Sequence, residues 1–168
     1  MVMIKAFKAG ALGLSLLLAS FSICSAADID DYLKGQRAHL DKDYAAALRE
    51  WLPLAKRGYH FAQNDLGEMY NDGTGVTQDY KEAVKWFRLS AEQGNANAMY
   101  NLGVMYAYGR AVIQDNVYAH VWFNIASSKN DTASGLFRDQ VASIMSASQL
   151  EKAQDLAREC VKKNYKGC

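Results

Sequence analysis

Two closely spaced glycines are the first residues of this sequence whose spacing could bind a ligand. Gly73 and Gly75 lie in the stretch LGEMYNDGTGVTQDY, residues 66–80. A glycine-rich loop that cradles a phosphate normally follows a buried strand and brings a lysine or a further glycine to the start of the next helix. This loop instead follows a helical pattern and contains no lysine. The sequence therefore favours a turn in which Gly73 ends a helix in the left-handed conformation, and it predicts no bound cofactor.

The other reactive side chains form no catalytic or metal-ligating pattern. The histidines, His39, His60 and His120, are widely separated and lack the spacing of a zinc-binding helix. His120 falls next to an apolar stripe and is expected on a helix surface. No serine stands within a G-x-S-x-G motif, the turn that exposes a hydrolase nucleophile. We therefore predict a protein that is not an enzyme, with no catalytic residues and no metal site.

Two cysteines lie near the end of the chain, in the stretch CVKKNYKGC. Cys160 and Cys168 are an even pair, which in an oxidising compartment is a disulfide candidate. Closing this short loop would stabilise the fold by about 2.5 kcal/mol through chain entropy. Two free thiols are one alternative. A metal pair is another, which the lack of a further Cys or His nearby disfavours.

The first 26 residues are typical of a secretory signal peptide. Lys5 and Lys8 precede a run of apolar or small residues from 9 to 23, and cleavage is expected after Ala26 or Ala27. That run would form a helix of about 22 Å, shorter than the hydrocarbon core of about 30 Å, so a retained membrane anchor is the weaker alternative. We predict a periplasmic or secreted protein with no stable membrane insertion after signal cleavage.

The composition suits one folded domain that does not bind nucleic acid. Half of the 168 residues are apolar, and three tryptophans and ten tyrosines supply large side chains for a core. Removal of the predicted signal takes away two lysines and no acids, so the formal charge falls from +1 to −1. A near-neutral chain without a polybasic tract has no electrostatic attraction for nucleic acid.

An internal repeat decides the expected fold. Residues 66–80 recur 36 residues later, at 102–116, with eight of fifteen positions identical. A shorter copy begins upstream at Asp43. Each copy is typical of two helices, and within 79–94 the apolar residues recur at the spacing of one helical face. The sequence therefore predicts an all-α fold, an α/α solenoid of antiparallel helix pairs with about three to four repeat units.

These patterns divide the chain into four segments. They are a signal peptide at 1–26, an N-terminal capping helix at 27–42, repeats with a period of 36 residues at 43–127, and a C-terminal capping helix pair with the Cys160/Cys168 tail at 128–168.

The repeated landmarks carry a family resemblance. The pattern A-x-x-x-LG-x-x-Y-x-x-G-x-GV-x-x-D-x-x-x-A-x-x-WF comprises Ala62, Leu66, Gly67, Tyr70, Gly73, Gly75, Val76, Asp79, Ala83, Trp86 and Phe87. It resembles the Sel1-like repeat, a relative of the tetratricopeptide repeat with a longer loop between its two helices. The resemblance implies that the first helix of each unit lines a concave surface that receives peptides or partner helices. By register, the residues expected on that surface are Tyr32, Gln36, His39, Asn64, Glu68, Asn71, Tyr100, Val104, Ala107 and Tyr108.

The same resemblance frames three hypotheses for function. The first is an exported, non-catalytic scaffold that binds another envelope protein or peptide, because similar proteins assemble complexes and take part in signalling at the bacterial envelope. The second is a secreted enzyme similar to cysteine-rich Sel1-like proteins that bind β-lactams. The third is a structural envelope component that contacts peptidoglycan or polysaccharide through exposed tyrosines.

Overall fold

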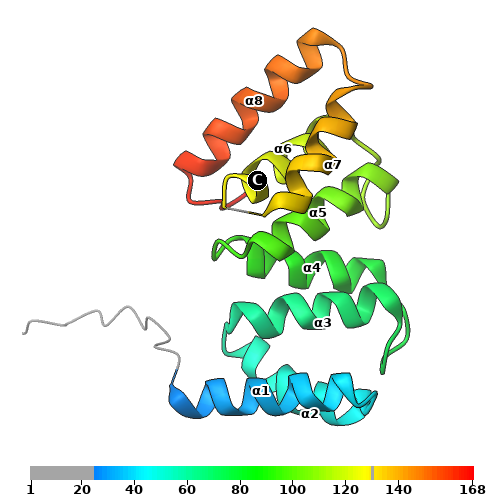
Figure 1. Cartoon of the computed structure of the whole chain (residues 1–168), viewed down its shortest axis with the longest axis vertical. Coiled ribbons are helices and arrows are strands. Elements are labelled where there is room, and N and C mark those ends of the chain that lie inside the picture. Colours follow the sequence, from blue (N-terminus) through cyan, green and yellow to red (C-terminus); the bar gives the residue numbers. More distant parts are fainter. Residues whose placement is uncertain (1–24, 130) are drawn as a thin grey trace, which may run out of the picture.

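The computed structural model describes residues 25–129 and 131–168, which form a solenoid of α-helices (Figure 1). No residue in those ranges belongs to a strand, so the predicted all-α fold is confirmed. Most of the predicted signal peptide, with Cys24, lies outside the described residues. The helices are α1 (Ala26–Leu40), α2 (Tyr44–Lys56), α3 (His60–Asp72), α4 (Tyr80–Ala91), α5 (Ala96–Tyr108), α6 (Asn116–Ser127), α7 (Thr132–Ala142) and α8 (Ala147–Lys162).

The second helix of each repeat begins at the same kind of cap. Asp43, Asp79 and Asp115 are spaced 36 residues apart and precede α2, α4 and α6. Each carboxylate accepts hydrogen bonds from backbone N–H groups of the first helical turn, which otherwise lack partners. Such a cap typically contributes about 1 kcal/mol. The repeat interval in the sequence therefore fixes where these helices start.

The loop that contains Gly73 and Gly75 begins at the end of a helix. Gly73 ends α3 with a φ of 72°, so it adopts the predicted left-handed conformation, and its repeat counterpart Gly109 ends α5 in the same way with a φ of 65°. The two loops are held by equivalent hydrogen bonds, from Gln78 Nε2 to the Asn71 carbonyl at 2.7 Å and from Gln114 Nε2 to the Ala107 carbonyl at 2.8 Å. Each glutamine side chain thus ties its loop to the helix before it. The left-handed glycines are therefore explained by the helix ends, without a ligand.

Glycines inside the first helices let paired helices approach closely. A methyl group built on Gly67 would lie 2.5 Å from the Phe87 ring, and one built on Gly103 would lie 2.6 Å from the Phe123 ring. Both distances are far inside van der Waals contact. The repeated glycine and phenylalanine therefore form one interlocking pair in each unit.

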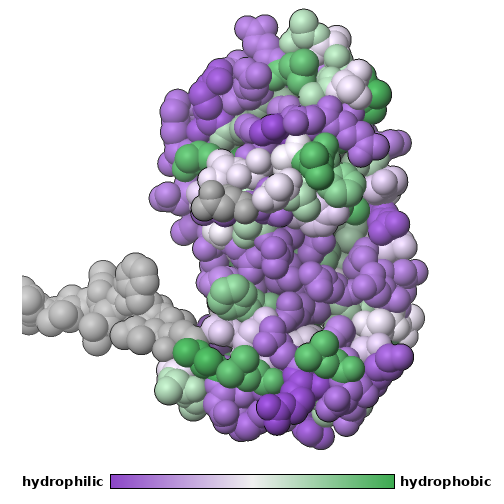
Figure 2. All heavy atoms as spheres, viewed as in Figure 1, coloured by the Kyte–Doolittle hydropathy of each residue, from purple (hydrophilic) through white to green (hydrophobic). Residues whose placement is uncertain are grey.

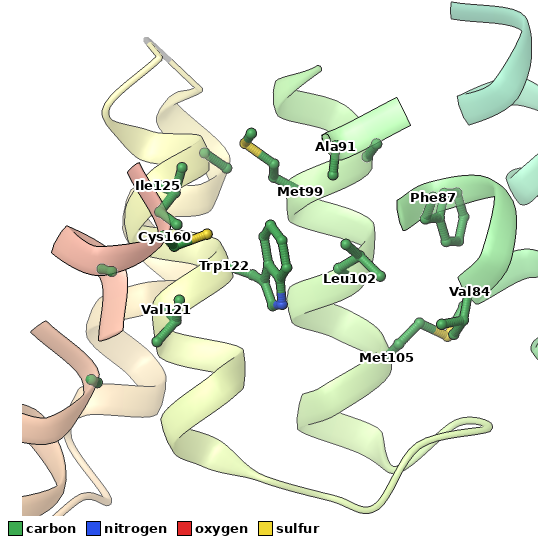
Figure 3. Close-up of a cluster of buried hydrophobic side chains, with 14 of the residues drawn as sticks. Val84, Phe87, Ala91, Met99, Leu102, Met105, Val121, Trp122, Ile125 and Cys160 are labelled. Carbon is green, nitrogen blue, oxygen red and sulfur yellow. The ribbon is translucent and has the colours of Figure 1, made fainter. Parts of the chain in front are cut away.

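The core runs along the solenoid between the two layers of helices, beneath a surface that is mostly hydrophilic (Figure 2). Figure 3 shows Phe87, Leu102 and Trp122 meeting from α4, α5 and α6. Phe87 and Trp122 are 1 % and 3 % exposed. Both rings thus serve packing between units.

The prediction that His120 lies on a helix surface is wrong. His120 is 5 % exposed because α6 is covered by α5, α7 and α8, so even its polar positions face other helices. Burial lowers the pKa of His120, and the charge of Arg138 lowers it further. In the part of the chain that the structure describes, no partner satisfies His120 Nδ1.

The C-terminal tail folds back onto α8. Cys160, which is 3 % exposed, forms a disulfide with Cys168. The loop that they close places the ring of Tyr165 4.9 Å from Lys129 Nζ. None of the helices within residues 25–129 and 131–168 has the length and hydropathy of a membrane span.

Candidate partner-binding site

The first helices of the successive units lie side by side and together form one surface, which we call the first-helix face. Side-chain contacts join its members in order: Tyr32 of α1 donates to Asp65 of α3 at 2.8 Å, and Asn101 of α5 donates to Asn64 of α3 at 3.2 Å. Tyr100 of α5 contacts Phe137 of α7, with ring centroids 5.3 Å apart. The structure therefore brings the predicted site residues of α1, α3 and α5 to a common side of the solenoid.

A chain of polar side chains crosses this face. Gln36 Nε2 donates to Tyr32 Oη at 3.0 Å, and Tyr32 Oη donates to Asp65 Oδ2. Asn64 Nδ2 donates to Glu68 Oε1 at 2.9 Å, and Asn101 Nδ2 donates to the same oxygen at 3.2 Å. These bonds hold Glu68 in a defined position although its side chain is exposed.

Asn64 requires a correction. It is only 3 % exposed because its amide lies between α3 and α5 and is saturated by Glu68 and Asn101. It therefore cannot contact a partner directly, although the sequence register placed it on the partner-binding surface. Its role is to position Glu68.

A hollow of about 270 Å³ opens on the first-helix face between α1 and α3. Its lining includes three predicted residues, Gln36, His39 and Glu68, and three others, Leu40, Trp51 and Asp65. The His39 and Trp51 rings form one wall, with centroids 5.5 Å apart. The Trp51 indole N–H donates to the Tyr32 carbonyl at 3.2 Å, which fixes the ring.

Burial and neighbouring charge perturb the pKa values of Asp65 and Tyr32. Burial raises the pKa of Asp65 to about 6, the charge of Glu68 adds to the increase, and the hydrogen bond from Tyr32 opposes it. The pKa of Tyr32 rises well above its usual range, because burial and the Asp65 carboxylate both disfavour a phenolate. Among the ion pairs of the described residues, none involves Asp65 or Glu68. The hollow thus carries two carboxylates without a basic partner.

Comparison with protein families assigns the repeat. The family described as Sel1 repeat matches residues 60–95 and 96–131. The chain contains two Sel1 repeats. The first begins at α3 and the second at α5, so the match covers the part with the 36-residue interval and confirms the resemblance. No curated protein matches the chain.

Two solved structures share the fold of these Sel1 repeats. One is a protective antigen present in uropathogenic Escherichia coli strains that displays an SLR fold, with 29% identity, a TM-score of 0.77 and coverage of 82% of this chain. The other is a Sel1 repeat protein from Oxalobacter formigenes, with 29% identity, a TM-score of 0.61 and coverage of 64% of this chain. This chain spans 30% and 44% of those two proteins, less than two thirds of either.

The second Sel1 repeat presents fewer of its predicted residues. Tyr100, Val104 and Ala107 are half-buried because they pack against the cluster of Ala119, Phe123 and Val141 from α6 and α7. They therefore offer less surface to a partner than exposed residues would. Tyr108, at the end of α5, is 66% exposed and stays available.

Asn71, at the end of α3 in the first Sel1 repeat, is half-buried. Its amide donates to Asp72 Oδ1 at 2.6 Å, and its own Oδ1 has no partner in the described residues. The structure therefore places Asn71 at the loop end of the face, outside the lining of the hollow.

Exposed apolar side chains lie on the two helices that line the hollow. Leu33 and Leu40 on α1 are 53% and 79% exposed, and Phe61 on α3 is 44% exposed. Figure 2 shows hydrophobic residues along α1 at the bottom of the view, mostly hydrophilic residues directly above it, and further hydrophobic patches near the top. Within residues 25–129 and 131–168, no group of three or more His, Cys, Asp or Glu could hold a metal ion.

Proposed function

We propose that the protein is a non-catalytic adaptor that binds a segment of another protein on the first-helix face. The observation that carries this proposal is the hollow between α1 and α3, where the exposed side chain of Leu40 lies beside two carboxylates that form no ion pair with any residue the structure describes. Monomer surfaces seldom leave apolar side chains grouped around a recess without a binding role. The Sel1 repeats support this function, because solenoids of helix pairs offer extended surfaces to partners.

We also propose that the adaptor acts outside the cytoplasm, in the periplasm or after secretion. The basic and apolar residues at positions 1–26 support export, and a disulfide between Cys160 and Cys168 is compatible with an oxidising compartment. Its partner would then be another envelope protein or peptide.

Affinity capture from envelope fractions tests the binding proposal. We expect the chain to recover a discrete partner, and the double substitution Gln36→Ala and Glu68→Ala to abolish that recovery. The matched control is Glu82→Gln on α4, which removes one half-buried acid away from the hollow and should retain the partner. Recovery that is equal for all three proteins would overturn the proposal. Turnover of a chromogenic β-lactam would overturn the non-catalytic assignment.

A further inference from the structure

We infer that the partner segment inserts a basic side chain, an arginine or lysine flanked by apolar residues, into the hollow between α1 and α3. This inference rests on the proposed function and specifies the chemistry of the bound segment. It is based on unused acceptor capacity, uncompensated charge and the apolar rim of the hollow.

The two carboxylates of the hollow retain free acceptor sites. A carboxylate offers about four lone-pair sites to donors. Asp65 accepts from Tyr32 at Oδ2 and from Asn64 at Oδ1. Glu68 accepts from Asn64 and Asn101, both at Oε1, so Oε2 has no donor among the described residues. The side chains of α1, α3 and α5 thus orient both acids without saturating them.

The charge in this hollow is one-sided. Of its six lining residues, Asp65 and Glu68 are acidic, and none is lysine or arginine. The groups that influence the Asp65 carboxylate are Tyr32, Asn64 and Glu68, none of which carries positive charge. A partly buried anion without a counter-charge is unfavourable, and a cation placed beside it removes that cost. Charge complementarity therefore selects a basic group as the occupant.

The walls of the hollow suit the stem of a long basic side chain. Lysine and arginine have aliphatic stems that pack on apolar surface while the charged end seeks a polar site. Leu40 supplies such surface, and a guanidinium can also stack on the half-buried ring of His39, which packs against the buried Trp51. Leu33 on α1 and Phe61 on α3 are exposed on the helices that line the hollow, where neighbouring apolar residues of the segment can pack.

The test is a titration of the full chain with synthetic peptides, followed by NMR of the tryptophan indole N–H groups. The probe is acetyl-Ser-Leu-Gly-Arg-Gly-Leu-Ser-amide, compared with versions that carry lysine, glutamine or glutamate in place of arginine. The Trp51 indole lines the hollow and reports binding there. The Trp122 indole, buried in the cluster between α5 and α6, is the internal control.

We expect the arginine and lysine peptides to shift the Trp51 signal and leave the Trp122 signal unchanged. Their affinity should exceed that of the glutamine peptide by about tenfold at low ionic strength, and salt should weaken it. Glu68→Gln and Asp65→Asn should each reduce the affinity several-fold, whereas Glu82→Gln should leave it unchanged.

Two results would overturn the inference. One is equal binding of the arginine and glutamate peptides, and the other is no shift of the Trp51 signal with any peptide. The capture experiment separates these failures from failure of the proposed function. A partner that is recovered in a manner dependent on Gln36 and Glu68 would still support an adaptor that uses this face, with a different bound chemistry.

Discussion

Replacing Asp65 by asparagine should stabilise the protein at neutral pH. Asp65 is held as an anion in a hollow that disfavours charge, and its pKa of about 6 compares with an ordinary value of 3.8. The difference corresponds to a cost of up to about 3 kcal/mol at pH 7. Asparagine keeps an oxygen that can accept the Tyr32 hydrogen bond but carries no charge. Allowing for partial solvation, Asp65→Asn should raise the free energy of unfolding by about 1–3 kcal/mol.

The sign of the pH dependence follows from the direction of the pKa shift. Between pH 3.8 and about 6 the folded chain binds a proton at Asp65 that the unfolded chain does not, so acidification favours the folded state. The advantage of Asp65→Asn should therefore be largest at pH 7 and should largely disappear at about pH 4. Urea unfolding of both proteins across this range measures it. Asp155→Asn, at an exposed position on α8, is the control and should change stability by less than about 0.5 kcal/mol.

A neutral or destabilising effect of Asp65→Asn at pH 7 would contradict the claim that the charge of Asp65 destabilises the folded chain. It would mean that groups in the folded chain compensate the Asp65 charge, and the argument for a basic partner would lose its electrostatic basis. An equal advantage at pH 4 and pH 7 would also refute it, because the effect would then not depend on the charge.

Four further predictions concern the scaffold. Gly67→Ala should lower the free energy of unfolding by about 1–3 kcal/mol, because its methyl group would meet the Phe87 ring; unchanged urea unfolding would contradict the proposed close approach. Ala111→Gly should stabilise by about 0.5–1 kcal/mol in the same assay, since Ala111 has a φ of 57° that glycine adopts without strain; a loss of stability would count against this assignment. Reduction of the disulfide should lower stability by about 2.5 kcal/mol, whereas Cys168→Ser should show no further response to reductant; a chain indifferent to reductant would show that the bond contributes nothing. The contribution of His120 to stability should fall as pH drops through about 6.5, because the lowered pKa leaves the folded chain with fewer protons at this residue than the unfolded chain, opposite in sign to the Asp65 contribution; a comparison of urea unfolding at pH 7 and pH 5.5 should show less acid destabilisation for His120→Phe, and an equal response of both proteins would assign the effect to other groups such as His60.

The sequence was sufficient to predict the solenoid because its signals are local and periodic. The 36-residue interval carries the caps at Asp79 and Asp115 and the left-handed glycines at Gly73 and Gly109, and each of these acts on its own helix end. Such features need no knowledge of distant contacts. The family match to residues 60–131 falls on the same segment.

The candidate site was predictable only in outline. Register placed Gln36, His39 and Glu68 on one face, where all three line the hollow, but a step of one residue turns a helical side chain by about 100°. The register therefore selected Asn64, which points between helices, and missed Asp65, which lines the hollow. The side of a helix that a neighbour covers depends on packing that the repeat pattern does not encode.

The part of the chain after the second Sel1 repeat explains the other differences. Its α7 lacks the landmark pattern of the repeats, so the sequence did not reveal that Phe137 packs on Tyr100. It also did not reveal that α6 is enclosed by three helices, which buries His120. Tyr100 and His120 both occupy positions that would be open to solvent if no further helix covered α5 and α6.

Site-specific photocrosslinking tests the central claim, that a partner occupies the first-helix face, most directly. A photoreactive amino acid is placed at Leu40 in the lining of the hollow or at Lys152 on α8, both exposed, and the crosslinked products in envelope fractions are compared. We expect one discrete product from Leu40 that the arginine peptide suppresses, with no such product from Lys152. Equal labelling from both positions, or none from Leu40, would contradict partner binding on this face.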